Sequence, residues 1–165
     1  MSQPHPEAHE PDLDTTTAAA LRLWVIMSRA HAAVSNHAAA DIARHGLTLA
    51  EFGILEALYH RGPMLLGEVQ KRILVSSGGI TFLVDRLAAK GLVERRTCET
   101  DRRARYAALT AKGEEVLREI FPVHAAVIAK AVSGISIEDQ QSVADLLREM
   151  GRHAASLPTP DDSRG

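Results

Sequence analysis

Small and hydroxylated side chains gather at a point where a helix is expected to begin. They are Ser76, Ser77, Gly78, Gly79 and Thr81, and Phe82 follows them. Small residues let a backbone approach a phosphate, and a helix N-terminus favours an anion. Thr81 can contact a base edge, and Phe82 can press on a thymine methyl group. The alternatives are that Gly78-Gly79 only marks a turn between helices and that Phe82 belongs to the core.

Positive charge is concentrated a little further along the chain, between Arg86 and Arg105. This window holds seven Arg or Lys residues against three acidic ones, a local charge of +4, whereas the whole chain of 165 residues has a net charge of -2. A basic patch on a near-neutral protein can bind phosphates without nonspecific electrostatic binding over the rest of the surface. The arginines expected to contact DNA are Arg86, Arg95, Arg102 and Arg103. Charge runs are also common in solvated loops, so this pattern alone leaves both interpretations open.

A regular apolar stripe predicts the helix that carries the small residues. The stripe recurs at i, i+3, i+4, i+7 and i+8 and consists of Ile80, Leu83, Val84, Leu87 and Ala88. Ser76 is expected to cap this helix and Gly91 to end it. A short helix over 66–73 precedes it. Two short strands, 92–96 and 105–109, follow it and are joined by a polar hairpin.

Longer helices flank this module. An Ala-rich helix is expected from residue 17 to about residue 44, ending at Gly46. Thr48 begins the next helix with Glu51 as its capping-box partner, and Gly62-Pro63 ends it. Its expected buried stripe is Phe52, Leu55, Leu58 and Tyr59.

Two further helices complete the chain. Thr110 caps a helix that runs to Val132, and Pro122 is expected to kink it or to end its first half. Ser136 with Asp139 caps the last helix. The apolar stripe of that helix is Val143, Leu146, Leu147, Met150 and Ala154.

The bulk composition narrows the class of protein. The single cysteine, Cys98, excludes an intrachain disulfide, and the eight histidines show no strong metal-ligand spacing. No apolar run approaches the ~20 residues of a membrane span, and the polar N-terminus is unlike a signal peptide. We therefore expect a cytoplasmic protein without a membrane segment, a metal or a cofactor. A phosphate loop, a nucleophile elbow and paired carboxylates with a histidine are all lacking, so an enzyme is not expected.

The order of short helix, helix, strand, hairpin and strand is that of a winged helix-turn-helix. Particular residues also resemble the MarR family of bacterial transcription regulators over residues 21–154. They are the run from Val75 to Leu87, the run from Lys90 to Arg95, and a wing signature in Asp101-Arg102-Arg103 and Leu109-Thr110-Ala111-Lys112-Gly113. The wing signature is the most specific of these.

The resemblance implies a mainly α fold with a small β-wing and a helical dimerisation region. It assigns 46–110 to the winged-helix DNA-binding domain and 17–45 with 111–156 to the dimerisation helices. The composition predicts a disordered acidic tail at 1–16 and a frayed tail at 157–165. A homodimer would then place two recognition helices in successive major grooves of a palindromic operator, and repression is the implied outcome. By the same resemblance Arg103 enters the minor groove and Asp101 orients it. Phe82 departs from the family, in which many members carry a polar group there.

Effector sensing has two candidate sites. Three features make the resemblance nearest to the branch that responds to quinones and catechol-like phenols: Ser-Ser-Gly before Ile-Thr-Phe, Cys98 before Asp101, and the run from Ile120 to His124. Trp24, Met27 and His31 share one face of the first helix at i, i+3 and i+7 and are expected to line an aromatic-accepting pocket. Alternatively, Met27 simply packs against neighbouring helices. Cys98 lies among arginines that favour its thiolate, so an electrophile could react there. A surface cysteine without a role is the alternative.

A winged helix can also serve as a protein-interaction module that lacks specific DNA binding. The arginines of the hairpin favour DNA, because a protein-binding module has no need of Asp101-Arg102-Arg103.

Overall fold

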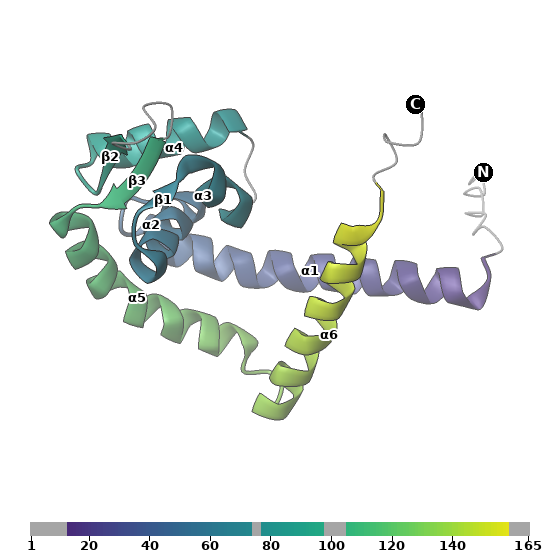
Figure 1. Ribbon diagram of the computed structural model, residues 1–165. Helices are drawn as coiled ribbons and strands as arrows, with labels where there is room; N and C mark the ends of the chain where they lie inside the picture. Colours follow the sequence, from purple (N-terminus) through teal and green to yellow (C-terminus); the bar gives the residue numbers. More distant parts are fainter. Residues whose placement is uncertain (1–12, 74–76, 98–104, 159–165) are drawn as a thin grey trace, which may run out of the picture. The chain divides into compact units, whose positions relative to one another are not determined.

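The computed structural model describes residues 13–73, 77–97 and 105–158 (Figure 1). The chain forms two compact units, which divide within the first helix after Asn36. The helices and strands run in the order α1 (Thr15–Ala43), α2 (Leu49–Arg61), β1 (Met64–Leu65), α3 (Leu66–Ile73), α4 (Ser77–Ala89), β2 (Val93–Thr97), β3 (Arg105–Leu109), α5 (Ala111–Val132) and α6 (Ile137–Ser156). The mainly α fold with a small β-wing is therefore confirmed.

The start of α1 lies slightly earlier than expected. The backbone N–H groups of Thr16 and Thr17 donate to Asp14 Oδ1 at 2.9 and 3.0 Å. The hydrogen bonds from Thr17 also hold the pKa of Asp14 below its usual value. Asp14 thus caps the helix, although the sequence placed it in an acidic tail that ran to residue 16.

The first turn of α2 is closed by the expected capping box. Thr48 Oγ1 accepts from the Glu51 backbone N–H at 3.2 Å, and Glu51 Oε2 accepts from the Thr48 backbone N–H at 2.7 Å. Gly62, with φ of 75°, ends the helix. Phe52, Leu55 and Leu58 are buried as expected.

Tyr59 was wrongly assigned to the buried stripe of α2, because its side chain is 43% exposed. Ile54 is fully buried, so the inward face of the helix is turned toward Ile54 and away from Tyr59.

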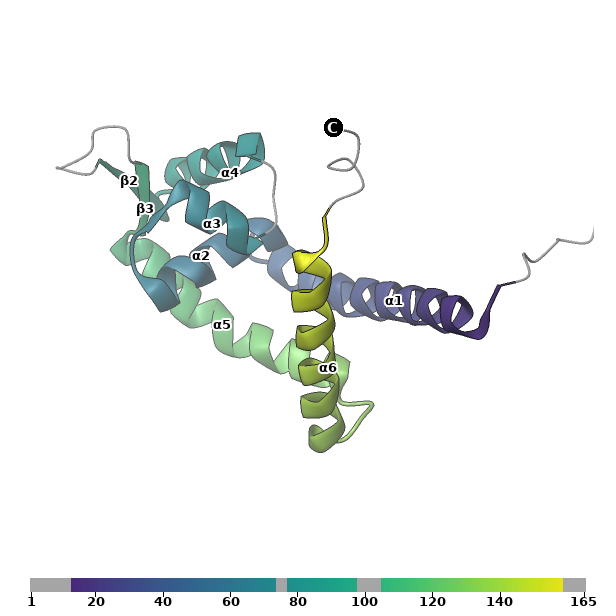
Figure 2. The ribbon, with the colours of Figure 1, turned by 45° about the vertical axis from the view of Figure 1, so that its right-hand side comes forward.

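The sheet has three antiparallel strands in the order β1-β3-β2. Strand β2 pairs with β3 from Val93↔Leu109 to Thr97↔Arg105, close to the two expected strands. Strand β1, which the sequence pattern did not predict, adds the pairs Met64↔Ala107 and Leu65↔Tyr106. Figure 2 shows the β2–β3 hairpin beside α4.

A tight seam joins the end of α4 to the start of α5. Gly91, with φ of 72°, lets the N–H groups of Gly91 and Leu92 return to the last turn of α4, to Ala88 O (2.9 Å) and Leu87 O (3.0 Å). Thr110 Oγ1 donates to Gly91 O at 2.7 Å and accepts from Gly113 N at 3.0 Å.

Gly113 is required at this seam by close packing. A Cβ atom at this position would lie 2.0 Å from the backbone oxygen of Leu92. The glycine of the wing signature is therefore explained by contact between two backbones.

The core lies between α2, α3, α4, the sheet and the first half of α5. Its fully or nearly fully buried members include Ile42, Phe52, Ile54, Leu55, Val69, Val84, Leu87, Ala107 and Leu117. The stripe of α4 is confirmed, since Ile80, Val84 and Leu87 are buried and Leu83 packs against the core. The outer face of α4 therefore lies outside the apolar core.

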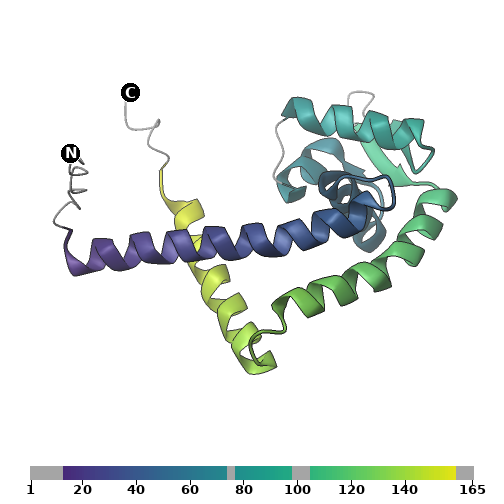
Figure 3. The same ribbon diagram turned by 180° about the vertical axis from the view of Figure 1, so that it is seen from behind.

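Helix α5 leads away from the sheet to α6 (Figure 3). It continues through Pro122 as a single helix, so the expectation that Pro122 ends its first half was wrong. The α6 residues, all of which the structure describes, include none that is buried. Among the described residues, no single helix has the length and composition of a membrane span. The α5–α6 pair passes that test only jointly, and it is bent by 94° at its break.

Candidate nucleic-acid interface

The outer face of α4 presents Thr81, Phe82, Asp85 and Arg86, all of which are exposed. Phe82 is 60% exposed, which excludes the alternative that its ring belongs to the core of its own chain. An exposed aromatic ring beside an exposed hydroxyl on one helix face can make apolar and hydrogen-bonding contacts with base edges.

The guanidinium group of Arg86 makes contacts with a carboxylate and with an aromatic ring. Its Nε lies 3.3 Å from Glu51 Oε1, and its Cζ lies 5.7 Å from the centroid of the Phe82 ring. The second distance is within the range of a cation–π contact. The Arg86 side chain is still 42% exposed, so it remains accessible to a phosphate.

Arg95 ties strand β2 to α4. Its Nη2 lies 2.7 Å from Asp85 Oδ1 and donates to Thr81 O at 3.4 Å. The neighbouring Arg96 pairs with Glu94 on its own strand, at 2.6 Å. Asp85 and Glu51 lie outside the window from which the local charge of +4 was counted. Part of that positive charge is therefore paired with carboxylates in the free protein.

The other expected DNA contacts lie partly outside the described residues. Ser77 and Gly78 belong to the first turn of α4, and Gly79 is half-buried there. Outside the described residues are Ser76, Cys98, Asp101, Arg102 and Arg103. Their roles remain predictions from the sequence.

Glu51 was expected only as a capping residue, but it is also the centre of an ionic cluster. The carboxylate is fully buried, and Oε1 accepts from Lys90 Nζ at 3.0 Å in addition to its pairing with Arg86. Burial by itself would raise the pKa of Glu51. The hydrogen bond from Thr48 and the charges of Lys90 and Arg86 outweigh that effect and hold the pKa below its usual value.

Comparison with known proteins identifies the architecture. A model described as MarR family matches residues 45–104. MhqR, an HTH-type transcriptional regulator of Bacillus subtilis (strain 168), is 39% identical over 138 residues, which cover 84% of this chain and 95% of MhqR. The chain belongs to the MarR family. The family predicted from the wing signature is thus confirmed, and the protein is a transcriptional regulator and not an enzyme.

Two solved structures, one of them described as a MarR family transcriptional regulator, share the fold. Sco3205 of Streptomyces coelicolor, solved in complex with DNA, has a TM-score of 0.78 and 26% identity, covering 92% of this chain and 94% of its own. BpsR of Bordetella bronchiseptica has a TM-score of 0.72 and 21% identity, covering 90% and 98%. The BpsR structure concerns regulation of its DNA binding by 6-hydroxynicotinic acid.

The three residues expected to line an effector pocket of this MarR-family chain lie on α1, within the first unit. Trp24 is 62% exposed within its chain, Met27 is half-buried, and His31 is exposed with Nε2 3.3 Å from Ser35 Oγ. The described residues of this unit supply no enclosing wall for the Trp24 ring.

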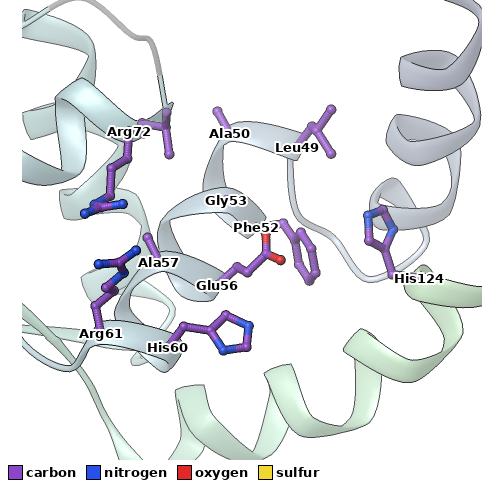
Figure 4. A pocket seen from close by; sticks show the side chains of 11 residues that line it. Leu49, Ala50, Phe52, Gly53, Glu56, Ala57, His60, Arg61, Arg72 and His124 are labelled. Atoms are coloured by element: carbon purple, nitrogen blue, oxygen red, sulfur yellow. The ribbon is translucent and has the colours of Figure 1, made fainter. Parts of the chain in front are cut away.

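The second unit contains a pocket of about 800 Å³ between α2, α3 and α5 (Figure 4). Its inner wall is made by Phe52 and His124, whose ring centroids are 4.7 Å apart. Arg61 and Arg72 face each other at another part of its wall in Figure 4. The sequence did not single out this pocket, because His124 on α5 is distant along the chain from the α2 and α3 residues that form the rest of the wall.

A buried carboxylate supports the inner wall of this pocket. His124 Nδ1 lies 3.2 Å from Asp41 Oδ2, and Arg44 pairs with the other oxygen of the same carboxylate. The hydrogen bond from Arg44 holds the pKa of Asp41 below its usual value, against the opposing effect of burial. The Asp41 side chain therefore fixes the imidazole of His124 in the pocket wall.

Large apolar side chains remain exposed along α1 and α6. The most exposed on α1 are Leu21, Leu23, Trp24 and Ile26, and those on α6 are Ile137, Val143, Leu146 and Leu147. Large apolar side chains exposed in such numbers on one helix indicate an interaction site. Among the described residues, no three possible metal ligands lie together.

Proposed function

We propose that this MarR-family regulator binds a palindromic operator as a homodimer, represses transcription, and releases DNA when a small phenolic or quinone ligand binds. The observation that carries the DNA-binding part is the outer face of α4. Thr81 and Phe82 are exposed there, while the opposite face of the same helix is buried in the core. Such a helix can enter a major groove without losing its own packing.

The wing completes the proposed contact. Arg103 is expected to enter the minor groove with Asp101 as its orienting partner, and Arg102 to approach the backbone. The pairing of Arg95 with Asp85 supports this arrangement, because it ties the base of the wing to α4. A hairpin anchored in this way can hold its arginines in a defined position relative to the recognition helix.

The exposed apolar stripes support the homodimer. Leu146 and Leu147 are 66% and 41% exposed on a helix that buries none of its residues within its own chain. A second copy of the chain would cover the same stripe in both subunits, as twofold symmetry requires.

The effector class rests on the sequence resemblance to the quinone- and phenol-responsive branch. Trp24, Met27 and His31 remain candidates to contact the ligand. The pocket beside Phe52 and His124 is an additional candidate, since it offers an aromatic wall and a fixed imidazole. Cys98 remains a candidate for reaction with an electrophile. The control that 6-hydroxynicotinic acid exerts on BpsR shows that a structural relative responds to a hydroxylated aromatic acid.

Selection of bound duplexes from a random pool tests the DNA-binding part directly. The proposal predicts enrichment of an inverted repeat, with a steep fall in affinity as salt rises, about 0.9 in log–log slope per phosphate contact. Arg103→Ala is expected to weaken binding by about 1–3 kcal/mol while the fold is kept. Weak binding that selects no sequence would instead favour a protein-interaction module.

The effector part needs a separate assay. A panel of phenols and quinones is titrated while tryptophan emission and binding of the selected duplex are followed. Release of DNA by at least one compound supports ligand control, and Cys98→Ser separates reversible binding from covalent reaction. A panel that changes neither signal would remove this part of the proposal and leave DNA binding intact.

A further inference from the structure

We propose that Glu51 is a positioning residue for DNA recognition, which acts through Arg86 to hold Phe82 in its base-contacting orientation. This inference rests on the proposed function, because it takes the outer face of α4 to be the surface that meets the bases. Glu51 itself lies in the core and would not touch DNA.

The contacts of Glu51 come from separate segments of the chain. Oε2 accepts from the Thr48 backbone N–H at 2.7 Å, which closes the first turn of α2. Oε1 lies 3.0 Å from Lys90 Nζ and 3.3 Å from Arg86 Nε, both on the C-terminal side of α4. One carboxylate therefore links the start of α2 to the recognition helix.

A direct path leads from this buried group to the surface. Glu51 is fully buried, the Arg86 side chain is 42% exposed, and Phe82 is 60% exposed. The guanidinium of Arg86 lies over the Phe82 ring with 5.7 Å between Cζ and the ring centroid. An arginine paired with a buried carboxylate has fewer favourable rotamers, so the ring that it covers is also restricted before DNA arrives.

Lys90 gives the cluster that it forms with Glu51 and Arg86 a net positive charge. Its Nζ also donates to Gly46 O at 2.8 Å, which fixes the ammonium group beside Glu51. The cluster then contains one carboxylate and two cations. Arg86 is oriented by Glu51 while the cluster as a whole still attracts a phosphate.

A purely structural role is the competing explanation, since Glu51 also forms the capping box. Thr48→Ala is the matched control, because it removes the hydroxyl that accepts from Glu51 N and leaves the carboxylate beside Arg86. Glu51→Gln does the opposite: it keeps a side-chain acceptor for the Thr48 N–H and removes the negative charge.

The test compares the affinities of these variants for the selected duplex and for random duplex, at a temperature where thermal unfolding shows each to be folded. Glu51→Gln is expected to bind the selected duplex about tenfold more weakly, with no loss on random duplex, because the cluster becomes more positive. Thr48→Ala is expected to keep the wild-type ratio between the affinities for the selected and the random duplex. In a Phe82→Ala background, Glu51→Gln should have little further effect, because its route to the bases has been removed.

The inference would be overturned if the effect of Glu51→Gln on affinity added fully to that of Phe82→Ala. Equal losses of affinity on both duplexes would overturn it as well.

If Glu51→Gln does not fold, Arg86→Lys decides the matter, since it keeps the charge and loses the Nε contact. That variant should lower the same ratio, and an unchanged ratio would contradict the proposal. Wild-type protein that selects no duplex refutes the proposed function, whereas a selective wild type with an equally selective Glu51→Gln refutes this inference alone.

Discussion

The winged-helix region buries its apolar side chains within its own chain, whereas α6 leaves its apolar side chains exposed. Val84 and Leu87 of α4 are 0% exposed, whereas Val143 and Leu146 of α6 are 45% and 66% exposed. Both helices have regular apolar stripes, so amphipathicity alone does not separate them. The difference indicates that the winged-helix region carries its own core and that α6 needs a second surface to cover its stripe.

The strongest test of this contrast is a charge placed on the stripe of α6. Leu147→Asp should destabilise the proposed dimer by about 3 kcal/mol or more, because a charge would enter an apolar interface. Sedimentation equilibrium should show monomers, and binding of the selected duplex should fall at least about a hundredfold. Gln141→Asp, on the opposite face of α6, is the control and should leave both unchanged. A dimer that survives Leu147→Asp would place the interface elsewhere.

A methyl group added at Gly113, in the seam between α4 and α5, tests whether the core of the winged-helix region depends on close packing there. Gly113→Ala should lower the free energy of unfolding by about 2 kcal/mol, because its Cβ would meet Leu92 O at 2.0 Å and force the seam apart. Urea denaturation measures the effect. Gly67→Ala, at a helical glycine with open space around its Cβ position, is the matched control and should lose little. Equal stability of the two variants would show that the seam can relax.

The positions predicted from the sequence were those governed by local signals. The bounds of α3 and the capping residues of α2, α5 and α6 follow from side chains within three or four positions of one another. The inward face of α4 was likewise evident from its periodicity. The family was indicated by the wing signature, whose glycine the structure explains by the contact with Leu92.

The features that were missed depend on partners distant along the chain. Strand β1 has two residues, too few for an alternating pattern, and exists because Met64 and Leu65 meet β3. Glu51 was identified as a cap, but its ion pairs with Arg86 and Lys90 span 35 and 39 positions. The pocket beside Phe52 and His124 is likewise a product of tertiary packing. Local pattern analysis has no signal for such pairs.

A smaller effect on the free energy of unfolding is expected at acidic pH. The pKa values of Glu51 and Asp41 are lowered in the folded chain, so the unfolded chain binds more protons in acid. The stability that these groups contribute is complete above the unfolded pKa, about 4.3 for glutamate. It is lost as the pH falls through the folded values. The stability difference between wild type and Glu51→Gln should therefore shrink in urea titrations as the pH falls below about 4.3, and a constant difference would contradict the ion-pair assignment.

The smallest predicted effect concerns the outer face of α4. Thr81→Ala should leave the fold intact and change discrimination among selected duplexes by about 1 kcal/mol, with little change in affinity for random duplex. Competition binding between the selected site and its single-base variants measures this. Discrimination that matches wild type at every position would remove Thr81 from the base contacts.

The most direct test of the whole account is a hydroxyl-radical footprint on the selected duplex. Two winged-helix regions joined through apolar helices predict two protected segments related by the inverted repeat, with centres about 10 base pairs apart. Both segments should disappear together in Leu147→Asp. A single protected segment that Leu147→Asp leaves intact would contradict the account.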